Sequence, residues 1–311
     1  GDMTLGTLGA FSEYANNIIW PMEIIGWLSN DLASAFASWK KIRRIMKQEP
    51  VIRDARDAAA LEQVRGRLTF DHVSLSLEGK EILGDVSFDL SPGKTLGIMG
   101  MTGAGKSMLV NLAQRFYDPT EGRVLLDGRD VKTLPVKQLR SSMAVVHQDV
   151  FLFSDTVRQN VRMGQKQKME EEVVPWALKR AGAFDFVSAL SKGAETLIGE
   201  RGVGLSGGQK QRISIAGAVA KKAPILILDD STSALDMETE RQIQRELDQM
   251  RDSAKIIIGH RVSAVRRADE ILILQDGRIA ERGTHEELME RRGQYYRTWQ
   301  VQYGEEVSQC Q

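Results

Sequence analysis

Residues 100–107, which read Gly-Met-Thr-Gly-Ala-Gly-Lys-Ser, constrain this chain more than any other stretch. They follow the pattern of a glycine, four residues and then Gly-Lys-Ser that defines a phosphate-binding loop. A short apolar run at residues 95–99 precedes the loop, and apolar residues at helical spacing follow it over residues 108–116. A strand, a glycine loop and a helix are the parts that such a site requires. The sequence therefore predicts a nucleoside triphosphate site.

The loop residues have separate predicted roles. The glycines let the backbone N–H groups face phosphate oxygens at the positive end of the new helix. Lys106 can reach the β- and γ-phosphates, and the Ser107 hydroxyl can ligate Mg²⁺. The alternative is a chance glycine turn beside a surface lysine, which would not account for the flanking strand and helix. The predicted phosphate-binding residues are Gly100, Met101, Thr102, Gly103, Ala104, Gly105, Lys106 and Ser107.

Composition limits the class of protein. Lysine plus arginine and aspartate plus glutamate both number 42 among 311 residues, so the formal net charge is zero. No basic stripe with interleaved aromatic residues is present, and we expect no nucleic-acid partner. The single cysteine, Cys310, cannot form an internal disulfide. Because the chain begins inside what reads as a longer segment, we expect it to be a piece of a larger protein.

The first 39 residues differ from the rest. Residues 5–39 are rich in large apolar side chains, but Glu13, Glu23 and Asp31 interrupt them. No uncharged run reaches the roughly 20 residues of a membrane span. One interpretation is an amphipathic helix packed on a soluble domain, and the other is a membrane helix whose polar face lines a water-filled cavity. The basic cluster at residues 40–44 fits the cytoplasmic side of a span. Hydropathy alone leaves both interpretations open.

Periodicity predicts the elements that follow a charged connector at residues 46–64. Alternating apolar residues favour an antiparallel sheet over residues 67–90, and residues 123–126 read as a further strand. Helical periodicity over residues 169–190 indicates a separate helical lobe. The predicted buried strands are residues 143–147, 225–229 and 255–259, and residues 271–307 read as a short strand pair and two helices.

A second candidate anion site lies at residues 205–209, which read Leu-Ser-Gly-Gly-Gln. Ser206 is predicted to cap a helix over residues 208–221, so free N–H groups, a hydroxyl and the positive helix end come together. The alternative is simply a well-capped helix. Both phosphate sites would be used if two such domains met head to tail and each covered the nucleotide of the other.

Polar residues end two of the predicted buried strands. Asp229 and Asp230 follow an apolar strand, where one carboxylate can hold Mg²⁺ and the other can orient the attacking water. The alternative is a solvated turn. His260 ends the next strand. A lone histidine is more often structural, but ligands of parallel sheets bind at the carboxyl ends of strands.

These motifs, taken in order, resemble the nucleotide-binding domain of ABC transporters over about residues 66–305. The motifs are residues 100–107, Gln148, residues 205–209, Asp229, residues 233–236 and His260. Residues 148–160 and 199–202 resemble the Q-loop segment and the domain-crossing loop of exporters. Residues 1–45 are then similar to the last transmembrane helix of a fused half-transporter.

The resemblance implies a fold, ligands and a place in the cell. The fold is a P-loop NTPase of the α/β class, with a mixed sheet core, an antiparallel β subdomain and a helical subdomain, preceded by a transmembrane helix. The ligands are ATP and Mg²⁺, and the activity is ATP hydrolysis coupled to export. The full-length protein would be multi-pass in the cell membrane, against lipid, with its nucleotide-binding domain in the cytoplasm. The implied segments are residues 1–48 (membrane part), 49–65 (linker) and 66–307 (nucleotide-binding domain).

Family roles transfer by position. The implied catalytic residues are Asp230, His260 and Gln148, and the implied Mg²⁺ ligands are Ser107, Gln148 and Asp229. The residues implied to hold the γ-phosphate of a partner domain are Ser206, Gly207, Gly208 and Gln209, with Asp236 contacting that partner. Gln148 would also sense the remaining transmembrane helices.

Two positions depart from the family pattern. Asp230 stands where most members have a catalytic glutamate, and Leu77 stands where an aromatic residue usually stacks on adenine. We therefore predict that the chain's own site binds ATP but hydrolyses it slowly, as in the degenerate subunit of a heterodimeric exporter, although His260 is retained. Two other interpretations are a soluble ABC-type ATPase of another class and a regulatory nucleotide sensor. The sequence does not indicate which substrate is transported.

Overall fold

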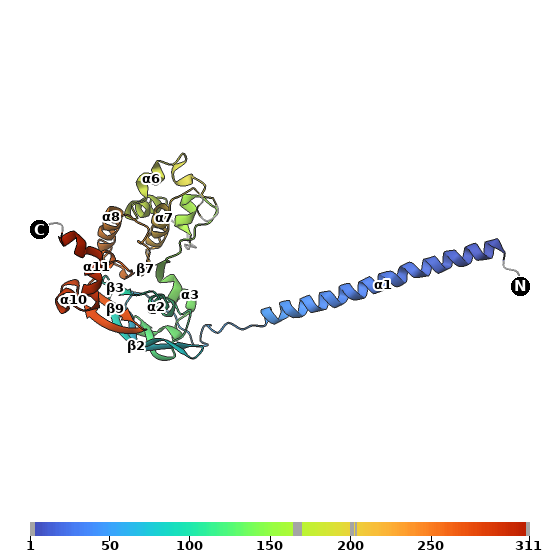
Figure 1. Ribbon diagram of the computed structural model, residues 1–311, viewed down its shortest axis with the longest axis horizontal. Helices are drawn as coiled ribbons and strands as arrows, with labels where there is room; N and C mark the ends of the chain where they lie inside the picture. Colours follow the sequence, from blue (N-terminus) through green and yellow to red (C-terminus); the bar gives the residue numbers. More distant parts are fainter. Residues whose placement is uncertain (1–3, 164–169, 200–201, 203, 309–311) are drawn as a thin grey trace. The chain divides into compact units, whose positions relative to one another are not determined.

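The computed structural model describes residues 4–163, 170–199, 202 and 204–308, and it contains two compact units, residues 1–51 and 52–311 (Figure 1). The predicted domain-crossing loop at residues 199–202 includes positions 200 and 201, which lie outside the described residues. Cys310 lies outside them as well.

The first unit consists mainly of one helix, α1 (Leu5–Met46), which continues through Pro21. Thr4 caps its start, because its hydroxyl oxygen accepts a hydrogen bond from the N–H of Thr7. None of its residues is buried, and Trp20 and Trp27 are exposed by 66% and 67%. Across the described residues, no helix has both the length and the apolar character that crossing a membrane requires.

The second unit begins with an antiparallel sheet, as the alternation over residues 67–90 predicts. Its strand order is β2-β1-β4-β5. The rings of Phe70 on β1 and Phe88 on β2 stack with their centroids 4.5 Å apart, which fixes the pairing of the two longest strands. The strands are β1 (Leu68–Leu77), β2 (Lys80–Leu90), β4 (Glu121–Leu126) and β5 (Arg129–Asp130).

A six-stranded mixed sheet forms the centre of this unit, in the order β10-β9-β3-β8-β7-β6. Its strands pair in parallel except for the antiparallel pair β9–β10. The strands are β3 (Thr95–Gly100), β6 (Met143–Val146), β7 (Ile225–Asp229), β8 (Ala254–Ile258), β9 (Glu270–Gln275) and β10 (Arg278–Gly283). This sheet confirms the predicted mixed α/β core.

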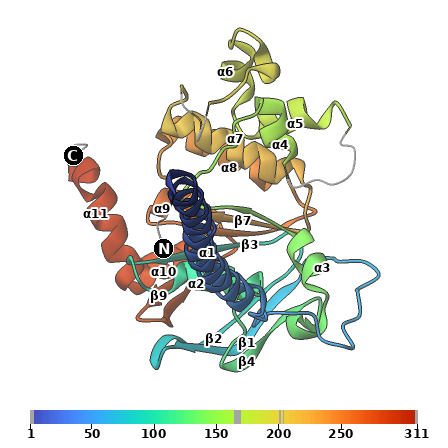
Figure 2. The same cartoon turned by 90° about the vertical axis from the view of Figure 1, so that its right-hand side faces the viewer.

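Helices cover the central sheet and form the predicted lobe. In both views, α4, α5, α6 and α7 lie on one side of the six-stranded sheet, and the four-stranded sheet lies on the other (Figures 1 and 2). The α-helices are α2 (Lys106–Ala113), α3 (Val136–Ser141), α4 (Val157–Arg162), α5 (Val173–Arg180), α6 (Phe184–Ser188), α7 (Gly207–Ala220), α8 (Met237–Asp248), α9 (Val262–Val265), α10 (His285–Arg291) and α11 (Gln294–Ser308). Two short 3₁₀ helices are η1 (Val131–Thr133) and η2 (Gly193–Glu195).

Strand β7 is apolar throughout because it is buried on both faces. Ile225 and Ile227 belong to the cluster that joins the two sheets, whereas Leu226 and Leu228 belong to the cluster under the helical lobe. Successive side chains of a strand point to opposite faces, so a parallel strand between two layers needs an unbroken apolar run. The same burial holds the polar end of β7 at a fixed place.

Candidate functional site

The phosphate loop leaves β3 and enters α2 through glycines in backbone conformations that other residues rarely adopt. Gly103 and Gly105 have φ angles of +84° and +98°. A Cβ atom on Gly105 would lie 2.7 Å from the side chain of Leu83, whereas one on Gly103 would meet nothing within 4 Å. Gly105 therefore packs against the β2 strand, and Gly103 faces open space where a ligand can approach.

Helix α2 begins at Lys106, two positions before the predicted start, because the Gly-Lys-Ser sequence itself forms its first turn. The Lys106 ammonium donates hydrogen bonds to the carbonyl oxygens of Gly100, at 2.8 Å, and Met101, at 2.9 Å. Burial lowers the pKa of Lys106, and the nearby charges of Asp229 and Asp230 partly oppose that effect. A lysine has three N–H donors, so one remains for an anion.

One hollow of about 270 Å³ joins the phosphate loop to the polar ends of the central strands. Thr102, Lys106 and Ser107 line it from the loop and α2, and the residues predicted from strand ends line it too, namely Gln148, Asp229, Asp230 and His260. The sheet register explains this, since Asp229 pairs with Ile258 and Ile98 pairs with Ile258 from the other side. The carboxyl ends of β3, β7 and β8 meet at one edge, where ligands of such sheets bind.

The two acids at the end of β7 differ in environment. Asp229 is buried, at 6% exposure, and closes the strand. Asp230 has a φ angle of +46°, and its N–H donates to the carbonyl oxygen of Ile258 at 2.9 Å. Burial raises the pKa of the Asp230 carboxyl, and the positive charge of His260 partly offsets the rise. A carboxyl with a raised pKa beside a phosphate loop is suited to proton transfer.

The pocket contains a donor set that fits a magnesium ion. Ser107, Gln148 and Asp229 offer a hydroxyl, an amide and a carboxylate to the same hollow. Mg²⁺ takes oxygen ligands, usually one or two from protein together with waters and substrate phosphates. The described residues include no group of three or more His, Cys, Asp or Glu side chains able to hold a metal. A Mg²⁺ ion at this pocket would take most of its oxygen ligands from water and the phosphates, so it does not require such a group.

The Leu-Ser-Gly-Gly-Gln segment begins helix α7 with Ser206 as its N-cap. The Ser206 hydroxyl accepts from the N–H of Gln209 at 3.3 Å, and the Gln209 side chain accepts from the N–H of Ser206 at 2.9 Å. Ser206 and Gly207 are exposed, and residues 205–209 do not line the hollow at the phosphate loop. Within one chain, the two predicted phosphate sites are separate.

Asp236 lies at the start of α8 rather than in the pocket. Its carboxylate accepts from the N–H of Thr239 at 2.9 Å and from the hydroxyl of the same residue at 2.8 Å. These bonds, led by the one from the Thr239 N–H, lower the pKa of Asp236. The side chain is exposed, and in the chain by itself it acts as a helix cap.

The residue expected beside adenine is not among those that line the hollow. Leu77 is half-buried at the end of β1, where it packs against the core between the two sheets. Ile82 from the paired strand β2 lines the hollow instead, together with Met108 of α2. The sequence reasoning missed both residues. The only signal for Ile82 was its place five residues after Leu77, just beyond the turn that joins β1 to β2.

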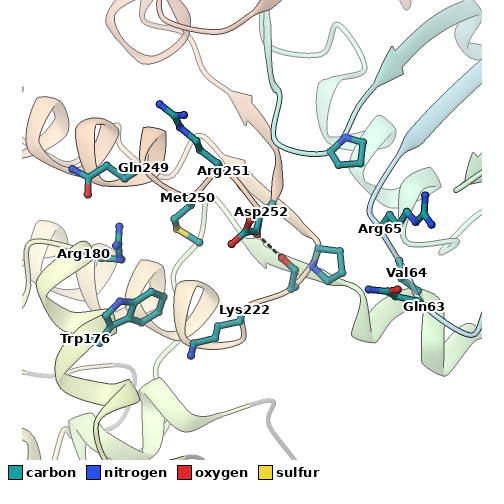
Figure 3. A pocket seen from close by; sticks show the side chains of 14 residues that line it. Gln63, Val64, Arg65, Trp176, Arg180, Lys222, Gln249, Met250, Arg251 and Asp252 are labelled. Carbon is teal, nitrogen blue, oxygen red and sulfur yellow. Dashed lines mark hydrogen bonds between the residues drawn. The ribbon is translucent and has the colours of Figure 1, made fainter.

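A larger hollow of about 850 Å³ lies elsewhere on this unit (Figure 3). Trp176 of α5 lies on its wall with Arg180 and Lys222 near its ring, at 5.0 Å and 5.2 Å from the ring centroid. Pro92, Pro224 and Ser253 line it just before β3, β7 and β8, at the amino ends of these strands. It lies away from the edge at which ligands of parallel sheets bind. The site at the phosphate loop is the better candidate.

The fold and the pocket together define a P-loop nucleotide-binding domain with an inserted helical lobe. Residues 83–233 match the protein family described as ABC transporter. The chain is 43% identical over 302 residues to an uncharacterized ABC transporter ATP-binding protein of Bacillus subtilis, covering 96% of this chain and 51% of the relative. It is 45% identical over 248 residues to the ATP-dependent lipid A-core flippase of Sodalis glossinidius, covering 79% and 43%.

A solved structure extends the likeness to three dimensions. A bacterial Atm1-family ABC exporter with ATP bound matches with a TM-score of 0.85 and 36% identity, over 97% of this chain and 53% of the exporter chain. The chain belongs to the ABC transporter family and contains its ATPase domain. It spans about half the length of the curated relatives it matches, including 53% of a Staphylococcus aureus export protein.

Proposed function

We propose that this chain is the ATP-hydrolysing part of an ABC exporter, in which ATP binding and hydrolysis drive export of a substrate across a membrane. The observation that carries the proposal is the single hollow shared by the phosphate loop, Gln148, Asp229, Asp230 and His260. The similarity to a lipid A-core flippase and to an Atm1-family exporter supports the direction of transport.

Each group of the pocket has a role in this proposal. Gly103, Lys106 and Ser107 hold the phosphates, and the N–H groups of the loop and the start of α2 supply positive potential. Ser107, Gln148 and Asp229 hold Mg²⁺, which neutralises charge on the phosphates when bound. Asp230 orients the attacking water and accepts its proton, and His260 donates a hydrogen bond to the γ-phosphate.

We assign the Leu-Ser-Gly-Gly-Gln segment to the ATP held by a second domain. Ser206, Gly207, Gly208 and Gln209 lie at the start of α7 and outside the chain's own pocket, and Ser206 and Gly207 are exposed. A head-to-tail dimer would bring this helix start to the partner's γ-phosphate, where its N–H groups and positive end favour negative charge. Asp236 would contact the partner close to the same place.

The relatives and the exposure of α1 support the proposal that it belongs to a membrane part. The match to the Atm1-family exporter covers 97% of the chain, so it includes most of α1. Large apolar side chains are exposed along that helix, and an exposed apolar surface of this size needs a partner. We propose residues 1–48 as the end of a transmembrane domain, residues 49–65 as a linker and residues 66–307 as the cytoplasmic nucleotide-binding domain. The partners of α1 are then the remaining transmembrane helices and lipid.

A surface beside Gln148 fits the connection to those helices. Phe151 and Phe153 are exposed by 57% and 48%, and their rings meet edge to face at 5.0 Å. They line a hollow of about 320 Å³ that also includes Asp149. Two exposed aromatic side chains beside a hollow are suited to receive a segment of the transmembrane domain. Gln148 would connect that contact to the nucleotide.

We further propose that the chain's own site is slow and that its partner is a different subunit. Asp230 is one methylene, about 1.5 Å, shorter than glutamate, and a misplacement on this scale can cost about a hundredfold in rate. The intact start of α7 would serve the faster site of the partner.

The test is ATP hydrolysis by the full-length protein in lipid, alone and mixed with candidate partner subunits. We expect slow hydrolysis alone and a clear increase with the correct partner, together with substrate-stimulated hydrolysis and transport into inverted vesicles. Fast hydrolysis alone would remove the heterodimer proposal but leave the exporter proposal standing. Tight ATP binding with no hydrolysis under any of these conditions would indicate a nucleotide sensor instead.

A further inference from the structure

Gln302 of the C-terminal helix α11 holds the backbone on both sides of the pocket histidine. Its amide nitrogen donates to the carbonyl oxygen of His260 at 2.8 Å, and its amide oxygen accepts from the N–H of Val262 at 2.9 Å. A backbone carbonyl can only accept and a backbone N–H can only donate, so both ends of the amide are matched to their partners. One side chain therefore fixes the turn that presents His260.

The bond to Val262 also completes a helix that has no cap of its own. Helix α9 starts at Val262, and Arg261 at the capping position makes no side-chain hydrogen bond to the first turn. The first N–H groups of a helix need partners from outside the helix. The Gln302 amide oxygen supplies one of them from a segment 40 positions further along the chain.

Other bonds hold the next residues of this turn. The guanidinium of Arg261 donates to the carbonyl oxygen of Ser233 at 3.1 Å, and the Ser263 hydroxyl donates to the buried Glu240 carboxylate at 3.1 Å. These bonds fix Arg261 and Ser263 from α8 and the segment before it. The carbonyl of His260 itself is held by Gln302.

Helix α11 is docked firmly enough to position this side chain. Tyr295 is fully buried, and its hydroxyl lies 2.7 Å from the Nδ1 atom of His285. Trp299 and Tyr303 follow at four-residue spacing on the same face and pack against the cluster that contains Val262 and Val265. Residues four apart lie on one side of a helix, so one face of α11 is fixed against α9. Gln302, next to Tyr303, is carried to the turn.

We propose that Gln302 is a positioning residue for ATP hydrolysis, and that the C-terminal helix therefore forms part of the active-site machinery. The proposal rests on the proposed contact of His260 with the γ-phosphate. Without the two bonds, the 260–262 turn gains freedom and His260 is less often in place when the bond to the γ-phosphorus breaks. ATP binding through the phosphate loop does not involve this turn and is unaffected.

The test compares Gln302→Met and Gln302→Glu in the full-length protein, with Gln300→Met as the matched control. Methionine keeps the side-chain length but removes both bonds, and glutamate keeps only the acceptor for Val262. Gln300 lies on the same helix, and its amide nitrogen donates to the hydroxyl of Tyr296 at 3.2 Å, away from the turn at residues 260–262. We expect both Gln302 variants to lower kcat about tenfold with KM for ATP within about twofold, while Gln300→Met changes neither.

Amide hydrogen exchange gives a second readout, because it reports on the bond to Val262 separately from the bond to His260. Val262 should lose protection in Gln302→Met and keep it in Gln302→Glu, although both variants are slow. An unchanged kcat in Gln302→Met, in a protein where His260→Ala is slow, would overturn the positioning role. An unchanged kcat in His260→Ala would instead overturn the proposed role of His260, and the positioning role would fall with it.

Discussion

The N–H of Asp230 donates to the carbonyl oxygen of Ile258 at 2.9 Å, which ties the acid after β7 to the strand that leads to His260. Asp230 is also held at a φ angle of +46°, a conformation in which the backbone has little room to move. The hydrogen bond and the narrow left-handed region both oppose a backbone shift that would move the carboxylate into the pocket. Its reach is therefore set by the length of its own side chain.

Replacing Asp230 by glutamate should accelerate hydrolysis at this site. The extra methylene, about 1.5 Å, brings the carboxylate closer to the attacking water, and we expect kcat to rise at least about tenfold. Steady-state ATPase assays of the full-length protein measure this change, and Asp230→Asn, which cannot accept the proton, should abolish activity. Equal rates for the parent and Asp230→Glu would show that aspartate is a competent substitute.

Hydrolysis should also depend on the protonation of Asp230. Burial raises its pKa above the ordinary value of 3.8, and only the ionised form can accept a proton. As the pH falls through the raised pKa, kcat should therefore fall, with circular dichroism confirming that the protein stays folded. If the acidic limb of the profile lies at or below the ordinary value, Asp230 is not the group that titrates.

The raised pKa of Asp230 also affects stability: the ionised carboxylate, which hydrolysis requires, destabilises the folded state. A folded-state pKa above the unfolded value means that the folded state binds the proton more tightly, so ionised Asp230 destabilises the fold at pH values above its pKa. Asp230→Asn should therefore raise the melting temperature at neutral pH. The gain should shrink as the pH falls, when the parent carboxyl is also neutral. Calorimetry across pH measures both, and a gain that is constant with pH would contradict this prediction.

Leu77 does not line the phosphate hollow, so an aromatic side chain at position 77 should strengthen nucleotide binding only where the base extends past the hollow to the end of β1. Leu77 offers no π-face to a base, and stacked aromatic contacts are worth about 0.5–1.5 kcal/mol, or about twofold to tenfold in affinity. Leu77→Tyr should therefore lower the Kd for ATP measured by titration calorimetry. Leu77→Met is the control, because it keeps an apolar chain of similar size. Identical affinities for the two variants would place the base away from residue 77.

A second capping box in the same chain makes it possible to separate the proposed role of Ser206 in ATP hydrolysis from its role in helix stability. Ser206 with Gln209 and Thr284 with Glu287 make the same pair of reciprocal bonds at the starts of α7 and α10. Replacing either cap by alanine should cost about 1 kcal/mol of stability. Only Ser206→Ala should also lower ATP hydrolysis in the dimer. A similar loss of activity in Thr284→Ala would show that the lower hydrolysis of Ser206→Ala comes from lost stability alone.

Local patterns predicted much of the fold and most of the pocket. The run from Ile225 to Leu228 identified a strand buried on both faces, and the glycine loop identified the start of α2 to within two residues. Asp229, Asp230 and His260 could be expected to meet, because the carboxyl ends of parallel strands share one edge of a sheet. In each case the information lies in residues close together in the chain.

The remaining features depend on contacts between distant segments. Ile82 lines the pocket because of the pairing of β2 with β1, which its own sequence neighbourhood does not specify. Gln302 reaches the turn after β8 because α11 docks through Tyr295, Trp299 and Tyr303, and no motif marks it. An amide side chain on a C-terminal helix reads as solvated surface until the packing is known. Long-range docking is therefore what the sequence did not show.

The separation of the phosphate loop from the start of α7 has a consequence for mixtures of damaged subunits. In a head-to-tail pair of identical chains, each composite site takes its loop from one subunit and its helix start from the other. If one subunit carries Lys106→Ala and the other Ser206→Ala, both lesions fall in the same site and the other site is wholly intact. Two inactive preparations should then regain activity when co-assembled. Such intersubunit complementation would occur only if the chain pairs with itself. If the chain needs a different partner subunit, the mixture would not regain ATP hydrolysis.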